Sequence, residues 1–244
     1  MPEEPIIFVW VALVRGMSNN IQSLLDTSAP VLASTCADTA IFYSISNAQA
    51  GLKGISFGDF LIKRVVSLLA AEFDNLKTFS TLSPVPSVSK FLKKSLQENF
   101  DQELFTVSER KSLQRLRPGL NDADTLSALL DESGWETTPQ FAKALENPLL
   151  RLCARYLLRE KRRGVLAADP GAHFHLSNGA RIERLNWLAD TSVNGINLSA
   201  GLMVNYLYKL NEIERNHEGY KGEGKIRASL SVRGLAKFRR DVIR

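Results

Sequence analysis

The most constraining feature of this sequence is a predicted strand, glycine-rich turn, helix and second strand between residues 40 and 86. Residues 40–46 form an apolar run of β-branched and aromatic side chains, which is typical of a strand. Residues 51–58 contain three glycines and predict an irregular turn, and from Asp59 apolar residues recur at helical spacing. A short strand over 77–82 ends before Pro84 and Pro86, because proline lacks the N–H that a strand ladder needs.

The glycine-rich turn is suited to binding an anion. Glycines let several backbone N–H groups face one point, and the N-terminus of the following helix favours negative charge. The spacing matches neither the dinucleotide-binding fingerprint nor a P-loop. From the residues alone, a phosphate site and an ordinary strand-to-helix turn both stay open.

Length and composition indicate a globular protein with a sizeable core. The chain has 244 residues, 44% of them hydrophobic and 23% charged, which excludes a disordered chain. No apolar run approaches the ~20 residues that span a bilayer. The two cysteines, Cys36 and Cys153, lack metal-ligand spacing and indicate reduced thiols. Without a recognisable export signal or a peroxisomal C-terminus, we expect a cytoplasmic protein.

The rest of the chain divides into a strand-like start, a helical middle and a mixed end. Residues 5–14 predict a strand covered on both faces, because the apolar run does not alternate. Residues 87–164 predict a helical insertion of several amphipathic helices, with a cap at Asn121 or Asp122 and a helix start at Pro139, and with residues 149–158 following Asn147-Pro148.

The pattern at the mixed end of the chain predicts a hairpin, a short segment that is either a strand or the start of a helix, a loop and a final helix. Residues 172–176 and 180–188 alternate around Asn178-Gly179, a strong hairpin signal. Residues 203–208 fit either a strand or the start of a helix. Residues 217–224 predict a polar loop that exposes His217, and residues 226–244 predict a basic helix.

Few residues carry an obvious chemistry. His173 and His175 share a face of the predicted strand, but no cysteine or acidic cluster completes a metal site, so we expect no metal. One functional histidine at a strand end is an alternative to a surface histidine. Ser83 either points into a cleft or bonds its own backbone. The basic residues 159–163 and 239–240 are either solvated faces or a seat for a ligand phosphate.

Five ordered blocks of the sequence resemble the C-terminal catalytic domain of the malonyl-CoA decarboxylases. The blocks are residues 42–46, 51–66, 79–86, 174–180 and 201–208. The resemblance covers nearly the whole chain, 1–244, as one catalytic domain with a helical insertion at about 87–164, and without the family's N-terminal helical domain. It implies an α+β fold, an acetyltransferase-like (GNAT) mixed sheet flanked by helices, with CoA wedged where two strands part.

The resemblance also implies the site residues. The catalytic pair is Ser83 and His175, supported by Ser44 and Tyr208. The turn that would hold the CoA pyrophosphate consists of Lys53, Gly54, Ile55, Ser56, Phe57, Gly58 and Asp59. Ser56 stands where some relatives carry an acid, which puts full activity in question.

The implied reaction is a step of fatty acid metabolism, the decarboxylation of malonyl-CoA to acetyl-CoA and CO2, with no metal or separate cofactor. His175 is the expected proton donor, with an ordinary pKa near ~6.5. Ser83 is either a hydrogen-bond partner of the malonyl carboxylate or the proton-accepting member of a Ser–His pair. A CoA-dependent acyltransferase and a non-catalytic CoA-binding remnant stay open as alternatives. A homo-oligomer also stays open, whereas no membrane is expected and a nucleic-acid partner is disfavoured, because the aromatic residues do not interleave with the basic runs.

Overall fold

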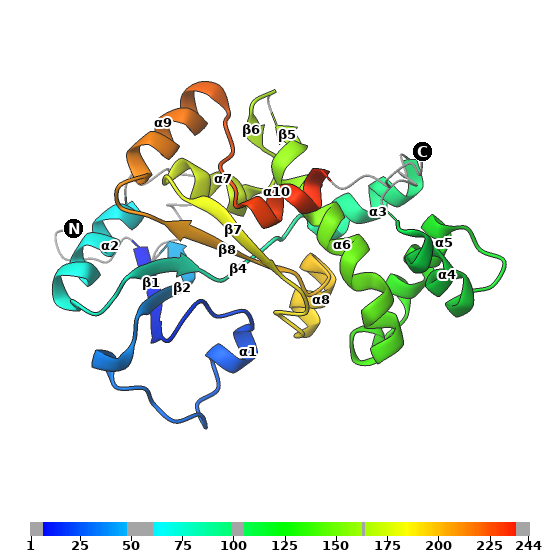
Figure 1. Cartoon of the computed structure of the whole chain (residues 1–244), viewed down its shortest axis with the longest axis horizontal. Helices are drawn as coiled ribbons and strands as arrows, with labels where there is room; N and C mark the ends of the chain where they lie inside the picture. The colour runs from blue at the N-terminus through cyan, green and yellow to red at the C-terminus, as the bar shows by residue number, and fades with distance from the viewer. Residues whose placement is uncertain (1–6, 48–60, 99–104, 163, 238–244) are drawn as a thin grey trace.

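The computed structural model describes residues 7–47, 61–98, 105–162 and 164–237, and a mixed sheet forms its centre (Figure 1). The strands are β1 (Ile7–Val14), β2 (Thr39–Asn47), β3 (Thr78–Thr81), β4 (Ser83–Pro84), β5 (Lys161–Arg162), β6 (Leu166–Ala167), β7 (Arg181–Asn186) and β8 (Met203–Tyr208). The helices are α1 (Ile21–Leu24), α2 (Leu61–Glu72), α3 (Val88–Glu98), α4 (Val107–Leu116), α5 (Asp122–Asp131), α6 (Pro139–Arg159), α7 (Pro170–Ser177), α8 (Val193–Ser199), α9 (Ile213–Glu223) and α10 (Leu230–Lys237). Within the described ranges, short 3-10 helices cover Ser34–Cys36 and Trp135–Thr137.

The main sheet contains one parallel pair among antiparallel ones. Its described strands run in the order β1-β2-β3-β8, with β4 and β7 also paired to β8. Strands β2 and β3 are parallel from Thr39↔Thr78 to Phe42↔Thr81, and the other pairings between described strands of this sheet are antiparallel. A single parallel bridge also joins Ile182 of β7 to Ala228. Helices flank the sheet (Figure 1). The expected GNAT-like layout, a mixed sheet with flanking helices, is therefore confirmed.

The prediction that residues 5–14 form a strand covered on both faces is wrong in one respect. Strand β1 forms, but among the described strands it pairs with β2 alone. The side chains of Phe8 and Trp10 are 48% and 56% exposed. The run lacks alternation although one of its faces is open, so alternation alone could not reveal its place at the edge of the described sheet.

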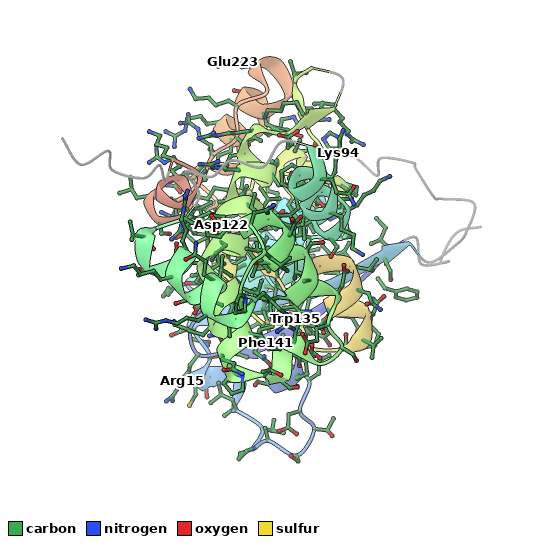
Figure 2. The ribbon with its side chains drawn as sticks, turned by 90° about the vertical axis from the view of Figure 1, so that its right-hand side faces the viewer. Arg15, Lys94, Asp122, Trp135, Phe141 and Glu223 are labelled. Atoms are coloured by element: carbon green, nitrogen blue, oxygen red, sulfur yellow. The ribbon has the colours of Figure 1, made fainter. Side chains whose placement is uncertain are left out.

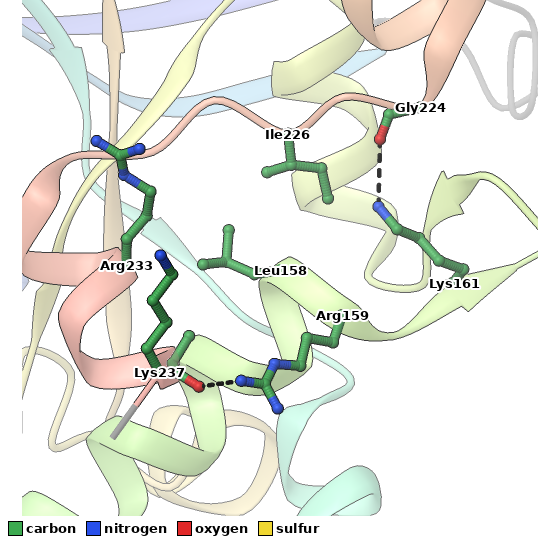
Figure 3. A pocket seen from close by; sticks show the side chains of 8 residues that line it. Leu158, Arg159, Lys161, Gly224, Ile226, Arg233 and Lys237 are labelled. Carbon is green, nitrogen blue, oxygen red and sulfur yellow. Dashed lines mark hydrogen bonds between the residues drawn. The ribbon is translucent and has the colours of Figure 1, made fainter. Parts of the chain in front are cut away.

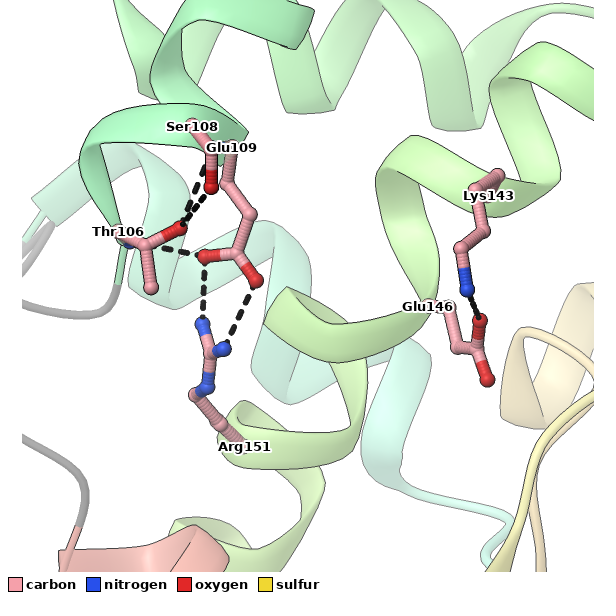
Figure 4. Close-up of polar contacts among 6 residues, drawn as sticks. All are labelled: Thr106, Ser108, Glu109, Lys143, Glu146 and Arg151. Carbon is pink, nitrogen blue, oxygen red and sulfur yellow. Dashed lines mark hydrogen bonds and ion pairs between the residues drawn. The ribbon is translucent and has the colours of Figure 1, made fainter.

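The predicted helical insertion is present as α3 to α6, at one end of the sheet (green in Figures 1 and 2). A capping box at Thr106 begins α4, and Asn121 caps α5 as expected. Figure 4 shows how α4 is tied to α6: Arg151 donates two hydrogen bonds, of 2.9 and 2.8 Å, to the Glu109 carboxylate. Burial opposes ionisation of Glu109, but the bonds from Arg151 and Thr106 outweigh it and lower its pKa.

Helix α6 begins at Pro139, as expected, and continues through Pro148. A proline inside a helix removes one hydrogen bond and costs roughly 3 kcal/mol. Here Pro148 is buried, and so are Leu145, Leu149 and Leu152 around it. Packing of this apolar stripe offsets the lost bond and keeps the helix in one piece.

The predicted hairpin over 172–188 is wrong in its first arm. Residues 170–177 form helix α7, and β7 pairs instead with β8. The side chain of Asp169 accepts a 2.9 Å hydrogen bond from the Ala172 N–H, and Pro170 occupies the first turn. Asp-Pro therefore begins a helix here, with the aspartate as its N-cap.

Two further predictions near the C-terminus need correction. His217 lies in helix α9 and not in a loop, and its Nδ1 is 2.6 Å from the Ser177 carbonyl oxygen. The predicted helix over 226–244 is shorter in its described part, where α10 covers Leu230–Lys237. Residues 203–208, which fitted either element, form the fully buried strand β8.

One hydrophobic core joins the sheet to the insertion. The same cluster contains Phe42 and Tyr208 from the sheet and Leu126 and Leu149 from the insertion. The insertion is thus packed against the sheet and not merely attached by its ends. No described helix combines the length and apolar character needed to cross a bilayer.

Candidate active site

Ser83 and His175, although 92 residues apart in the chain, form a hydrogen bond of 3.0 Å between Oγ and Nε2. The other ring nitrogen of His175, Nδ1, is 2.9 Å from the Tyr208 hydroxyl. Strand β4 supplies the serine, the last turn of α7 the histidine, and the end of β8 the tyrosine. Three of the four predicted catalytic or supporting residues are therefore in one hydrogen-bonded chain.

The pair lies where two strands of the sheet part. The parallel ladder between β2 and β3 ends at Phe42↔Thr81, followed by one hydrogen bond from the Leu82 N–H to the Phe42 carbonyl. Beyond this point β2 pairs only with β1, whereas Ser83 pairs with Val204 of β8. The serine therefore stands at the opening between β2 and β4.

Ser44, the fourth predicted residue, lies on the β2 side of this opening. It pairs with Trp10 of β1 and is half-buried. Within the described chain, its side chain makes no hydrogen bond to Ser83, His175 or Tyr208. Its supporting role stays a prediction.

The imidazole of His175 is buried and held from several sides. Its side chain contacts Ser83 and Tyr208 through hydrogen bonds, and the ring of Tyr206 stacks on it at 4.5 Å between centroids and 24° between planes. Sequence reasoning missed Tyr206, because the signal for residues 203–208 did not decide between strand and helix. Only a strand places residues 206 and 208 on the same face.

Burial changes the titration of this group. The buried environment lowers the pKa of His175 to about 3, so the expected ordinary value near ~6.5 is wrong. Burial also raises the pKa of Tyr208, which keeps its hydroxyl protonated. A neutral imidazole and a protonated phenol therefore form the resting pair at neutral pH.

The other two histidines take no part in this hydrogen-bonded chain. His173 bonds the Tyr220 hydroxyl at 2.8 Å through Nδ1 and not the residues around His175. Residues two apart on a helix point in different directions, so the shared face expected for His173 and His175 does not exist. No group of three potential metal-binding side chains gathers among the described residues.

The residues of the glycine-rich turn, from Lys53 to Asp59, lie outside the described residues. The helix expected after the turn is present as α2, from Leu61 in its described part. The predicted anion-binding role of this turn therefore stays a prediction.

A separate surface hollow of about 440 Å³ lies between the end of α6, β5 and α10 (Figure 3). It is lined by Leu158, Arg159, Lys161, Gly224, Ile226, Arg233, Ala236 and Lys237. Arg159 donates to the Ala236 carbonyl at 2.6 Å, and Lys161 to the Gly224 carbonyl at 3.4 Å. Neither residue of the Ser83–His175 pair lines this hollow, so part of the basic run at 159–163 faces a different surface.

Fold and geometry place this chain among α/β proteins in which a half-buried serine bonds a buried histidine at the opening of a mixed sheet. The family model of the malonyl-CoA decarboxylase C-terminal domain matches residues 1–243. The chain belongs to this family.

Curated relatives match nearly the whole of this chain. It is 43% identical over 238 residues to the mitochondrial malonyl-CoA decarboxylase of Anser anser anser, covering 95% of this chain and 47% of that protein. The enzyme of Rattus norvegicus is also 43% identical, over 240 residues, with 96% and 48% covered. The chain thus spans about half the length of the curated relatives it matches.

Solved structures agree with this relationship. Malonyl-CoA decarboxylase from Rhodopseudomonas palustris superposes with a TM-score of 0.84 at 44% identity, covering 95% of this chain and 49% of that one. The protein from Agrobacterium vitis gives a TM-score of 0.81 at 43% identity, with 95% and 53% covered.

Proposed function

We propose that the chain decarboxylates malonyl-CoA to acetyl-CoA and CO2 through Ser83 and His175. The observation that carries this proposal is the 3.0 Å hydrogen bond between the two side chains, in a chain that belongs to the malonyl-CoA decarboxylase family. The glycine-rich turn, residues 53–59, is proposed to hold the CoA pyrophosphate. The opening between β2 and β4 is proposed to admit the thioester end of the ligand.

The low pKa of His175 suggests how the proton moves. An anionic malonyl carboxylate beside the ring would favour the charged imidazolium and raise its pKa, so His175 takes up a proton when the ligand binds. Loss of CO2 breaks the carbon–carboxylate bond and leaves its electron pair on the thioester as an enolate. His175 then returns its proton to the α-carbon, directly or through the Ser83 hydroxyl, and becomes neutral again. Burial favours this neutral product state.

The acyltransferase alternative is less well supported. It needs an acceptor amine and gives no role to a hydrogen-bonded Ser83–His175 pair. The remnant alternative predicts that CoA binds without turnover, and the experiment below distinguishes it from the decarboxylase.

The first test is turnover of malonyl-CoA by the purified chain, followed as acetyl-CoA formation. Ser83→Ala and His175→Ala should each lower kcat by at least ~10²-fold, because each removes part of the proton path. His173→Gln, on the same helix but bonded to Tyr220, is the matched control and should stay within about threefold of the unmodified chain. Near-normal turnover in His175→Ala, or none in the unmodified chain, would contradict the proposal.

The second test concerns the glycine-rich turn. Gly54→Val and Gly58→Val should weaken CoA binding, because a branched side chain blocks the close approach of backbone N–H groups to phosphate. Calorimetric titration with CoA measures the change. Gly222→Ala is a suitable control, since its new methyl group would meet no described atom within 4 Å. Unchanged affinity in both valine variants would remove the turn from the site.

A further inference from the structure

The antiparallel ladder between β8 and the strands that lead to Ser83 is interrupted next to the serine. Residues Phe79 and Ser80 pair with Tyr208 and Leu207, and Ser83 and Pro84 pair with Val204 and Met203. Both pairings follow one register. The two positions between them, Thr81 opposite Tyr206 and Leu82 opposite Asn205, are not part of the ladder.

Side chains take over the hydrogen bonds at this interruption. The Asn205 Nδ2 donates to the Thr81 carbonyl at 2.7 Å, and the Tyr206 N–H donates to Thr81 Oγ1 at 3.1 Å. Thr81 and Asn205 are fully buried. A side-chain amide that bridges two strands holds their backbones farther apart than a direct backbone hydrogen bond does. The size of the Asn205 amide therefore sets the separation of the two strands at this point.

Asn205 uses all of its hydrogen-bonding capacity. Its Nδ2 also donates to the Ser18 carbonyl at 3.0 Å, and its Oδ1 accepts from Arg184 Nε at 3.0 Å and Asn186 Nδ2 at 2.9 Å. Guanidinium nitrogens only donate and carbonyl oxygens only accept, so the amide has one orientation that satisfies all four contacts. Such a completely bonded, buried amide has one well-defined position.

Side chains on the opposite face of β8 hold His175, the second member of the Ser83–His175 pair. Successive side chains on a strand point to opposite faces, so Tyr206 and Tyr208 lie across the strand from Asn205. These two tyrosines contact the His175 ring by stacking and by a hydrogen bond to Nδ1. One strand therefore contacts both the segment that leads to Ser83 and the imidazole that Ser83 bonds.

We propose that Asn205, acting with Thr81, is a positioning residue that sets the separation of Ser83 Oγ and His175 Nε2. The kinetic test of this inference rests on the proposed function, whereas the test by NMR spectroscopy does not. If the amide only stabilised the fold, its loss would lower stability without selectively affecting the pair.

Asn205→Asp tests the proposal with nearly unchanged shape. The new carboxylate keeps an acceptor for Arg184 and Asn186, but it presents an oxygen to the carbonyls of Thr81 and Ser18, and both contacts are lost. We expect kcat for malonyl-CoA to fall about 10- to 100-fold while KM changes little, because a shift of about 1 Å in a reacting group has an effect of this size.

Thr81→Val is the second variant, in case Asn205→Asp fails to fold. It keeps the shape of the side chain and removes the acceptor of the Tyr206 N–H. Thr125→Val is the matched control, since Thr125 is equally buried, lies in helix α5, and its hydroxyl has no hydrogen-bond partner among the described residues. The control should keep kcat, whereas Thr81→Val should lower it.

A double-mutant cycle separates positioning from general destabilisation. In a chain that already carries Ser83→Ala, Asn205→Asp should cost no more than about twofold in residual turnover, because the hydroxyl it positions is gone. The same fold-loss in both backgrounds would overturn the proposal. So would an Asn205→Asp variant that is folded and keeps kcat within about twofold of the unmodified chain.

A readout independent of turnover is the ring nitrogen NMR spectrum of His175. The chain has three histidines, so the signals are assigned by single substitutions. Asn205→Asp and Thr81→Val should shift the Nε2 signal as the bond to Ser83 lengthens, and Thr125→Val should not. Unshifted signals in both variants would overturn the positioning role. Absence of turnover in the unmodified chain would instead reject only the proposed function.

Discussion

Two tyrosines of β8 contact the same imidazole in different ways. Tyr208 places its hydroxyl 2.9 Å from His175 Nδ1, whereas Tyr206 contributes the face of its ring. The Tyr206 hydroxyl is buried and finds no hydrogen-bond partner among the described residues. A buried hydroxyl without a partner is unfavourable, so the two phenols should respond oppositely to removal of their oxygen.

Tyr208→Phe should lower kcat about tenfold, because the ring of His175 loses the bond that orients it. Tyr206→Phe should keep kcat within about twofold and raise the melting temperature, since it keeps the stacked ring and removes an unbonded polar group. Steady-state kinetics and thermal unfolding of both variants measure these effects. Equal losses of kcat in the two variants would show that the hydroxyl of Tyr208 has no special role.

At the scale of elements, the joint between α7 and β7 is tightly constrained. Gly179 has φ +80°, and a Cβ at this position would lie 2.3 Å from the Ile213 carbonyl oxygen at the start of α9. Only glycine adopts this backbone freely and leaves room for the close approach of α9. The joint therefore holds the C-terminal end of the helix that carries His175.

Gly179→Ala should lower the free energy of unfolding by at least ~2 kcal/mol, because backbone strain and a steric clash add together. Gly222→Ala is the comparison, since this glycine lies inside α9 with open space around it and should leave stability unchanged or raise it by up to ~1 kcal/mol. Urea unfolding of both variants gives the difference. If Gly179→Ala lowered the free energy of unfolding by less than an ordinary surface substitution does, α9 would be able to move away from residue 179 at little energetic cost.

Elements with a simple local signal were predictable from the sequence. The cap at Asn121 and the strand at 78–81 are where the pattern placed them. Helix α7 was not predictable, because its apolar residues alternate as in a strand and Asp169-Pro170 is a signal for both a turn and a helix start. Packing of α7 against α9 decides between the two, and this packing involves residues far apart in the sequence.

The candidate site was predictable only in part and for the same reason. The resemblance nominated Ser83, His175 and Tyr208, and the structure brings them together. No local pattern pointed to Tyr206 or Asn205, because their roles depend on which strand faces which helix. The effect of burial on His175 was likewise invisible in the sequence, since neighbouring residues do not reveal how deeply a side chain is buried.

For the whole molecule, the buried His175 links stability to pH. Its pKa is about 3 in the folded chain and near ~6.5 when unfolded, so between these values only the unfolded chain binds the proton. Stability should therefore fall as pH decreases below ~6.5, by about 1.4 kcal/mol per pH unit from this group. Above ~6.5 the histidine is neutral in both states and contributes no pH dependence.

Comparison with His175→Gln isolates this effect, because all other titrating groups are shared. Between pH 7.5 and pH 5.5, the unmodified chain should lose about 1.4 kcal/mol more of its unfolding free energy than the variant. Urea unfolding at the two pH values measures this difference. Parallel pH dependence in the two proteins would mean that the ring of His175 is protonated within the fold.

The separation of Ser83 and His175 along the chain has a consequence for how the protein folds. The whole insertion, α3 to α6, lies between them, and their hydrogen bond closes a loop of 92 residues. Helices form within about a microsecond, whereas contacts of this sequence separation come together slowly because closing a long loop costs entropy. During refolding from urea, the helical circular dichroism signal should therefore recover well before the Ser83–His175 hydrogen bond forms. Assembly of the Ser83–His175 pair is then a late event in folding, reached only when α7 brings His175 to β4 and β8.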